Sequence, residues 1–125
     1  MACHHAAMNT ILIVDDHAAF RVQARAVLEE DGFKVVGEAD TGLGGLAAVR
    51  ELKPYLVLLD IGLPDVEGFE VARALAGDGP PPFVLLTSTR DASAYGKRVA
   101  NSRALGFIPK DELSGAAIRS LTDRL

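Results

Sequence analysis

Short apolar runs alternate with longer amphipathic stretches along most of the chain. Aliphatic runs at 11–14, 55–59 and 83–87 are typical of strands that are buried on both faces of a parallel sheet. Two further runs, 34–39 and 104–109, are less regular but carry similar β-branched or aromatic residues. The pattern therefore predicts five strands.

An amphipathic stretch follows each predicted strand. The first, 17–32, places apolar residues at helical spacing, with Asp16 as the predicted N-cap and Gly32 just past the end. These apolar residues are Phe20, Ala24, Val27 and Leu28. They predict the buried side of a first helix.

The second helix is predicted over 41–52, with Thr41 as its N-cap and Pro54 beyond its end. Its expected packed side consists of Leu43, Leu46, Ala47 and Val49. The remaining helices are predicted at 66–77, at 94–102, where the pattern is weak, and from residue 112 or 114 onward. Strands and helices thus alternate to the end of the chain.

This alternation favours crossover connections onto a parallel sheet, because parallel neighbours need a connection that also covers a sheet face. The predicted class is a doubly wound α/β fold. Residues 9–125 form one predicted domain, without an internal repeat or a linker. In such folds ligands bind beyond the carboxyl ends of the strands.

Composition narrows the class of partner and the compartment. The 125 residues carry a net charge of -4 and no run of Lys or Arg, so direct binding of nucleic acid is disfavoured. Cys3 is the only cysteine, which excludes an intrachain disulfide framework and fits a reducing cytoplasm. No apolar run reaches the length of a membrane span, and the first ten residues do not resemble a signal peptide. We expect a soluble cytoplasmic protein.

Residues 1–8 are interpreted as a disordered tail or a remnant of an expression vector. A metal site at Cys3, His4 and His5 is the less favoured alternative. Met8 is a candidate natural start.

Polar side chains stand where the predicted strands end. Asp15 and Asp16 follow the first strand, and Asp60 ends the third. The fourth strand ends in Thr87 with Ser88, and Lys110 follows the fifth. Each has an ordinary structural reading, as a cap, a turn residue or a solvated charge, but together they predict one polar rim.

The rim favours phosphoryl chemistry. Two unit charges about 4 Å apart repel by roughly 4 kcal/mol at an effective dielectric near 20, so clustered carboxylates hold protons or recruit a cation. Hard oxygen ligands favour Mg²⁺, or Mn²⁺ in its place. Asp60 is then a candidate nucleophile toward phosphorus, with Thr87 and Lys110 neutralising the transferred oxygens.

Four segments, ILIVDDH, LVLLDIGLPDVEGFE, VLLTS and GFIPK, resemble in order and spacing the receiver domains of bacterial two-component response regulators. The resemblance covers nearly the whole chain from Asn9 and implies a flavodoxin-like sheet of order 2-1-3-4-5. It implies a histidine kinase as phosphoryl donor and an output domain or partner protein, with homodimerisation on phosphorylation as a candidate response. It further implies a switch in transcription regulation that turns over no external metabolite.

The same resemblance implies a role for each acidic position. Asp60 would be the phosphoacceptor. Asp16 and Asp60 would bind Mg²⁺ directly, Asp15 would assist, and the Gly62 backbone carbonyl would bind the same ion.

Roles also follow for the later motifs. Thr87 would be the switch hydroxyl that turns toward the phosphoryl group, and Phe107 the aromatic whose rotamer follows it. Lys110 would pair with the phosphoryl group. Pro64 and Gly68 match the loop before the third helix.

Two features depart from the commonest family pattern. Many members place proline directly after the lysine, in a cis bond, whereas here Pro109 precedes Lys110 and Asp111 follows, as in NarL-type receivers. Phe107 replaces the commoner tyrosine. The geometry of the lysine loop and the details of the switch are therefore expected to differ.

Other functions remain as alternatives. A phosphohydrolase of the haloacid dehalogenase type needs an acid two residues after its nucleophile, where this chain has Gly62. A flavodoxin-like flavin carrier would want hydroxyls rather than two carboxylates after the first strand. A phosphorylation-independent protein-binding module is disfavoured by the intact acidic triad.

Two expectations concern dynamics. Gly62 and Thr89 lie where the family tunes water access, and since neither is bulky, a short-lived phosphoryl group is expected. The segment 90–107 is rich in small and polar residues, so its helix should be marginal. We expect this segment to change on phosphorylation.

Overall fold

A computed structural model of the chain describes residues 8–76 and 81–123. The candidate metal residues Cys3, His4 and His5, and all of the predicted tail except Met8, lie outside the described residues.

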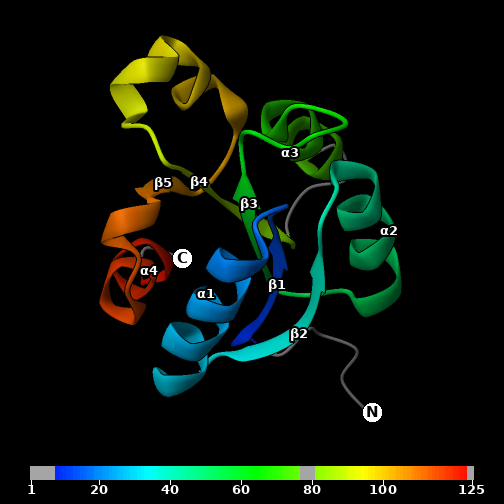
Figure 1. Ribbon diagram of the computed structural model, residues 1–125, viewed down its shortest axis with the longest axis vertical. Coiled ribbons are helices and arrows are strands. Elements are labelled where there is room, and N and C mark those ends of the chain that lie inside the picture. Colours follow the sequence, from blue (N-terminus) through cyan, green and yellow to red (C-terminus); the bar gives the residue numbers. More distant parts are fainter. Residues whose placement is uncertain (1–7, 77–80, 124–125) are drawn as a thin grey trace.

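The centre of the molecule is a parallel sheet of order β2-β1-β3-β4-β5, as the resemblance implied. The strands are β1 (Thr10–Val14), β2 (Lys34–Ala39), β3 (Leu56–Asp60), β4 (Phe83–Ser88) and β5 (Gly106–Pro109). In the described ranges four α-helices cover it, α1 (Ala18–Glu30), α2 (Gly42–Leu52), α3 (Gly68–Ala76) and α4 (Gly115–Thr122). Figure 1 shows α1 and α4 on one face of the sheet and α2 and α3 on the other. None of the helices in the described ranges is long and apolar enough to cross a membrane.

Each face of the sheet carries its own core. Ile11 and Ile13 pack with α1 and α4, whereas Leu12 and Val14 pack with α2 and α3. Successive strand residues point to opposite faces, so a strand covered on both sides must be apolar throughout. Val57, Leu58 and the other residues of β3 before Asp60 are accordingly fully buried. They fix Asp60 at the carboxyl edge.

The start of α1 differs from the prediction. The N-cap is His17, and no side chain caps the helix there, so the assignment of Asp16 as N-cap is wrong. Asp15 instead accepts a hydrogen bond from the His17 backbone N–H, at 2.8 Å. Phe20, Ala24 and Leu28 are buried as predicted, whereas Val27 is only half-buried.

The buried side of α2 also differs. Thr41 caps this helix as predicted, accepting from the Gly44 N–H, but Leu43 is 61% exposed and Ala47 is exposed too. Gly42 and Gly45 face the core instead. A Cβ on Gly45 would lie 2.9 Å from the Val14 side chain, so the helix approaches β1 through its glycines. Leu46 and Val49 pack against the core as predicted, so Gly42 and Gly45 replace only Leu43 and Ala47 on the buried side of α2.

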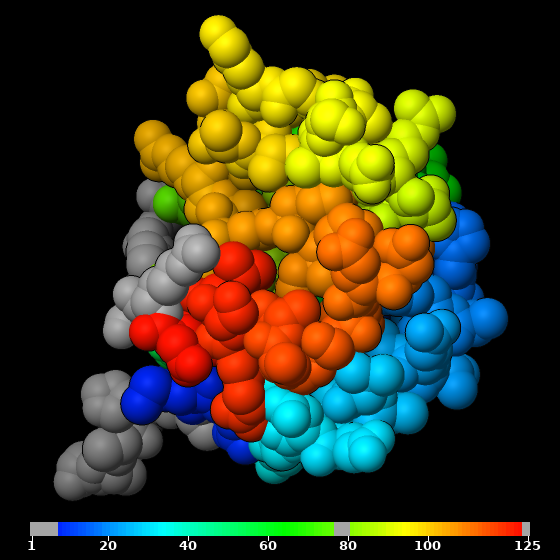
Figure 2. All heavy atoms as spheres, turned by 90° about the vertical axis from the view of Figure 1, so that its left-hand side faces the viewer, coloured from blue at the N-terminus to red at the C-terminus, as the bar shows by residue number. Residues whose placement is uncertain are grey.

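The connection from β4 to β5 contains no α-helix. The helix predicted over 94–102 is replaced by two 3₁₀ segments, η1 (Ala92–Arg98) and η2 (Ala100–Ser102). Gly96 interrupts η1 with a φ of 59°, which lies outside any right-handed helix. These segments form a lobe at one end of the molecule, drawn in yellow at the top of Figure 2. A third 3₁₀ turn, η3 (Lys110–Glu112), follows β5 directly.

The loop between β3 and α3 is held from both sides. The Gly68 N–H donates to the Ile61 carbonyl at 2.9 Å, which closes the loop on the end of β3. Asp65 accepts from the backbone N–H groups of Gly42 and Leu43, so its carboxylate also satisfies free donors at the start of α2. The residues after Asp60 are thereby fixed to two helices.

Candidate functional site

Three carboxylates meet at the carboxyl edge of the sheet. Asp15 follows β1 and is fully buried, and Asp60 ends β3 with 3% of its surface exposed. The Asp16 side chain is 32% exposed, on the solvent side of the group. β1 and β3 are neighbours in register from Ile11 and Leu56 onward, so their final acids are forced together. The predicted acidic cluster is present.

Lys110 is the positive charge of this group. Its Nζ lies 2.7 Å from Asp15 Oδ2 and 3.5 Å from Asp60 Oδ2, and its side chain is only 10% exposed. The ammonium also lies 4.5 Å from the centre of the Phe20 ring, an attractive cation–π arrangement. The sequence placed Lys110 at the rim correctly.

His17 is a neighbour that the sequence reasoning missed. Its Nδ1 lies 3.1 Å from Asp15 Oδ1 and 3.2 Å from Asp16 Oδ1. The Lys110 ammonium is 3.4 Å away from the same nitrogen. His17 directly follows Asp16 in the sequence, and this adjacency to the acidic pair was the available signal.

Burial raises the pKa of the Asp60 carboxyl above its usual range. The charge of Asp15 raises this pKa further, whereas Lys110 and the Gly62 N–H, which lies 3.1 Å from Asp60 Oδ1, lower it. The surroundings of Asp60 therefore make its ionised form energetically unfavourable. A bound cation, or conversion of the carboxylate to an uncharged acyl group, removes this cost.

Replacing Asp60 by asparagine is consequently expected to stabilise the fold in metal-free buffer. The gain at neutral pH should be about 1 kcal/mol, less than the roughly 4 kcal/mol repulsion of two charges 4 Å apart at a dielectric near 20, because Lys110 already offsets part of it. A raised pKa means that the native state binds the proton more readily, so the gain must shrink as the pH falls through the folded pKa and below. Urea unfolding from pH 7.5 to 4.5 with a chelator measures it.

Asp65→Asn is the matched control with the opposite sign. Backbone hydrogen bonds from Leu43 and Gly42 lower the pKa of Asp65, so its ionised form supports the fold. The contribution of Asp65 is present above the unfolded pKa and is lost as the pH falls through the folded one. This variant should lose stability at neutral pH. If both variants lose stability, the surroundings of Asp60 do not disfavour its ionised form.

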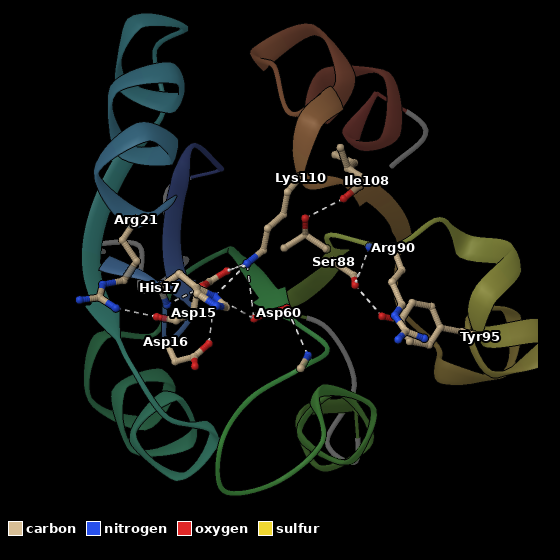
Figure 3. Close-up of polar contacts among 12 residues, drawn as sticks. Asp15, Asp16, His17, Arg21, Asp60, Ser88, Arg90, Tyr95, Ile108 and Lys110 are labelled. Atoms are coloured by element: carbon tan, nitrogen blue, oxygen red, sulfur yellow. Dashed lines mark hydrogen bonds and ion pairs between the residues drawn. The ribbon is translucent and has the colours of Figure 1, made fainter. Parts of the chain in front are cut away.

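A pocket of about 190 Å³ opens above the carboxylates. Its lining consists of His17, Asp60, Gly62, Ser88, Thr89, Arg90, Tyr95 and Lys110. Figure 3 shows Asp15, Asp60 and Lys110 converging at the end of the sheet, with Ser88 and Tyr95 on the opposite side of the site. Water occupies about 30 Å³ per molecule in the liquid, so the pocket has room for several waters or a small anion.

Thr87 is not brought to this pocket. Its side chain is fully buried, and its hydroxyl donates to the Ile108 carbonyl at 2.7 Å. Ser88, one residue further, lines the pocket instead. Ser88 was placed at the rim from the sequence, but the switch role was assigned to Thr87. The geometry favours Ser88.

Phe107 packs near the pocket, and Gly62 lines it. Phe107 is half-buried and packs into the cluster beneath α3, with its ring 6.1 Å from that of Tyr95. Gly62 is exposed at the pocket beside Thr89, so neither residue shields Asp60 from water. The bond between Lys110 and Asp111 is not cis, in line with the departure seen in the sequence.

The donor set fits a hard divalent cation. One ligand atom each from Asp15, Asp16, His17 and Asp60 lies within 4.8 Å of the others. Asp15 Oδ2 is buried without a hydrogen bond of good geometry, although the Lys110 ammonium stands beside it as an ion pair. A buried carboxylate oxygen of this kind has unused capacity for a cation. The carboxylates can therefore hold a metal ion at the rim.

Comparison with known proteins agrees with this geometry. The sequence model of one protein family, the response regulator receiver domain, matches residues 11–121 of the chain. The chain belongs to the response regulator receiver family. It is therefore a receiver domain of a two-component system.

Named relatives of this receiver are transcription regulators. The chain is 43% identical over 104 residues to BvgA of Bordetella pertussis, named a regulator of virulence factors, covering 83% of this chain and 50% of BvgA. The chain thus spans about half the length of the curated relatives it matches.

Solved receiver structures superpose closely. The signal receiver domain of NarL from Mycobacterium tuberculosis matches with a TM-score of 0.79 and 32% identity, covering 90% of this chain and 95% of that one. The BeF₃-activated receiver domain of RstA from Klebsiella pneumoniae gives a TM-score of 0.80 and 26% identity, covering 91% and 96%.

Proposed function

We propose that this receiver accepts a phosphoryl group on Asp60 from a histidine kinase and changes conformation in response. The observation that carries the proposal is the buried pair of Asp15 and Asp60 joined by the Lys110 ammonium, open to solvent through one small pocket. Such an arrangement concentrates charge where a transferring phosphoryl group would need it.

Asp15, Asp16 and Asp60 would hold a magnesium ion, with manganese as a substitute, and the Gly62 carbonyl completes the proposed set. When bound, the ion supplies positive charge to the oxygens of the transferring group. The chain's own residues do the rest. Asp60 attacks phosphorus through a carboxylate oxygen and forms an acyl phosphate, while the leaving group departs on the opposite side.

Lys110 and a hydroxyl would bind the transferred oxygens. The Lys110 ammonium is already 3.5 Å from Asp60 Oδ2 and needs little movement to reach a phosphoryl oxygen. Ser88 lines the same pocket, whereas the Thr87 hydroxyl is engaged by Ile108. We assign the hydroxyl role to Ser88 in place of Thr87. Phe107 packs beside the segment that would follow the change.

The phosphoryl group is proposed to be short-lived. Gly62 and Thr89 leave the pocket open, so water can reach the phosphorus of an acyl phosphate on Asp60. The domain would thus catalyse its own phosphorylation and dephosphorylation and act on no external metabolite.

Output and location extend the same proposal. BvgA, which is about twice as long as the matched region, is named a transcription regulator, so we propose that this receiver controls an output domain or a partner protein in the cytoplasm. Homodimerisation on phosphorylation is the candidate response. Nucleic acid would be bound by the output part and not by this acidic domain, whose net charge is -4.

Incubation with acetyl phosphate and Mg²⁺ followed by intact mass measurement tests the proposal. The wild-type chain should gain one phosphoryl group, and the gain should vanish in Asp60→Ala and with a chelator. Glu51→Ala, a change at an exposed acid on α2, should leave the gain intact. No gain in the wild-type chain would favour the alternative of a phosphorylation-independent binding module.

A further inference from the structure

Tyr95 makes a direct contact with the hydroxyl that the proposed function requires. Its Oη lies 2.5 Å from Ser88 Oγ, at the short end of the range for O–H···O hydrogen bonds. The Arg90 backbone N–H donates to the same serine oxygen at 3.1 Å. Figure 3 shows the Ser88 and Tyr95 side chains pointing toward one another. The Ser88 hydroxyl is therefore already engaged.

The tyrosine ring is held by two other aromatic side chains. Phe69 of α3 meets it edge to face, with ring centres 5.6 Å apart, and Phe107 of β5 lies 6.1 Å away in a tilted arrangement. Tyr95 is half-buried and belongs to the cluster beneath α3. Packing of this kind fixes the ring and leaves its hydroxyl directed at the pocket.

Tyr95 is also an anchor for a weakly held segment. None of the residues of η1 is buried, and Gly96, directly after Tyr95, has a φ of 59°. Apart from the two chain neighbours of Gly96, no atom of the described residues lies within 4 Å of the position that a Cβ there would occupy, so the backbone at Gly96 is open. A second attachment of η1 is Arg98, whose guanidinium pairs with Glu67 at the exposed surface. Surface pairs of this kind add little stability.

We infer that Tyr95 is a positioning residue that holds the Ser88 hydroxyl away from Asp60 until a phosphoryl group arrives. Ser88 has one oxygen on one rotor, so Oγ cannot stay at hydrogen-bond distance from Tyr95 Oη and also turn toward a phosphoryl oxygen on Asp60, whichever of the two hydroxyls donates. Turning of Ser88 toward Asp60 therefore breaks the contact with Tyr95 and releases η1. The inference rests on the proposed function and names the regulation of that site.

The coupling runs in both directions by linkage. If a phosphoryl group weakens the contact between Ser88 and Tyr95, loss of that contact must favour the phosphorylated form. Phe107 cannot supply this contact, because it lacks a hydroxyl. Tyr95 thereby takes part of the role that the family resemblance assigned to the aromatic at 107.

Tyr95→Phe is the variant that removes only the hydroxyl. The ring stays between Phe69 and Phe107, so the fold should be retained. The affinity for beryllium fluoride with Mg²⁺, a mimic of the phosphoryl group, should rise roughly two- to tenfold in titration calorimetry, the equilibrium factor of one net hydrogen bond. Tyr55→Phe is the control, since Tyr55 directly precedes β3 at the amino end of the strand, away from the carboxyl edge, and its affinity should equal that of the wild type.

Tyrosine fluorescence reports directly on the contact between Ser88 and Tyr95. The chain has two tyrosines and no tryptophan, so a Tyr55→Phe background leaves Tyr95 as the only fluorophore of this kind. Adding beryllium fluoride with Mg²⁺, as a phosphoryl mimic, should change the Tyr95 emission. Adding Ser88→Ala to this background should change the emission without the mimic and abolish the further response. Tyr95→Phe, with Tyr55 retained, should show no response.

The outcomes distinguish this inference from the proposed function. If Asp60 is phosphorylated, but Tyr95→Phe binds the mimic with wild-type affinity and the Tyr95 emission does not change when the mimic is added, the inference is overturned while the function stands. Identical emission with and without Ser88→Ala in the unmodified protein also overturns it, whether or not Asp60 accepts a phosphoryl group. Absence of phosphorylation in the wild-type chain instead counts against the function.

Discussion

Replacing Lys110 by methionine is expected to slow phosphoryl uptake by Asp60 about 10²- to 10³-fold, the usual effect of deleting one preorganised positive or donor group at a reacting oxygen. The Lys110 ammonium stands 2.7 Å from Asp15 and 3.5 Å from Asp60, so it is placed for the transferred group before that group arrives. The time course of intact mass with acetyl phosphate measures the rate.

The same variant should also destabilise the fold in metal-free buffer. It leaves Asp15 and Asp60 buried without their counter-charge, and breaking a buried pair by removing one partner costs about 3–5 kcal/mol. Mg²⁺ should restore part of this loss, because a cation can replace the missing charge. Urea unfolding with a chelator and with Mg²⁺ separates these two states.

Lys97→Met is the matched control, since Lys97 is exposed on η1 and its loss should change neither quantity. Lys110→Arg keeps the charge and should lie between the wild type and Lys110→Met in uptake rate. A Lys110→Met protein that takes up phosphate as fast as the Lys97→Met protein would remove Lys110 from the mechanism.

Gly68→Ala is expected to be the most damaging of the glycine substitutions near the site. A Cβ at this position would lie 2.4 Å from the Asp60 carbonyl oxygen and 2.7 Å from Ile61 Cα, both backbone atoms that no side-chain rotation can move. The cost should be about 2–3 kcal/mol in unfolding free energy. Uptake should fall roughly tenfold or more, since small displacements of a reacting group are costly.

Gly62→Ala tests whether this effect belongs to the position and not to glycine as such. The nearest atom to a Cβ on Gly62 is Asp60 Oδ1, at 4.0 Å, an ordinary contact. Alanine keeps the N–H that donates to Asp60, so this variant should fold within about 0.5 kcal/mol of the wild type. Equal destabilisation in the two variants would show that Gly68 does not fix the end of β3.

Much of the fold could be predicted because the strands are buried on both faces. Continuous apolar runs such as that of β3 leave few alternatives to a sheet covered by helices on either side, and crossover rules then bring the strand ends to one edge. The positions of Asp15, Asp60 and Lys110 at one rim follow from that topology. Their contacts in the structure agree with it.

Packing between elements explains where the sequence reasoning failed. The buried side of α2 includes Gly45 because of its close approach to Val14, and no periodicity of apolar residues reports a close approach. The helix expected over 94–102 gave way to 3₁₀ turns, in which Gly96 adopts a left-handed φ. In both cases small residues decided the local structure. Gly45 acts through its close approach to Val14, which is distant in the sequence, and Gly96 through a φ that other residues rarely adopt.

The hydroxyl at the end of β4 was ambiguous for a related reason. Thr87 and Ser88 are adjacent, and which of them reaches the pocket depends on their pairing with β5. Thr87 is opposite Ile108 in that pairing, and its hydroxyl donates a hydrogen bond to the Ile108 carbonyl. Ser88 is left for the pocket and for Tyr95.

The chemical identity of the phosphorylated residue decides whether Asp60 is the phosphoacceptor. Borohydride reduces an acyl phosphate to an alcohol, so a phosphorylated aspartate becomes homoserine and can be located by peptide mass spectrometry. After treatment with acetyl phosphate and Mg²⁺, we predict homoserine at position 60 alone, and none without the divalent ion. Homoserine at position 15 or 16, or none at any position, would contradict the assignment of Asp60 as the phosphoacceptor.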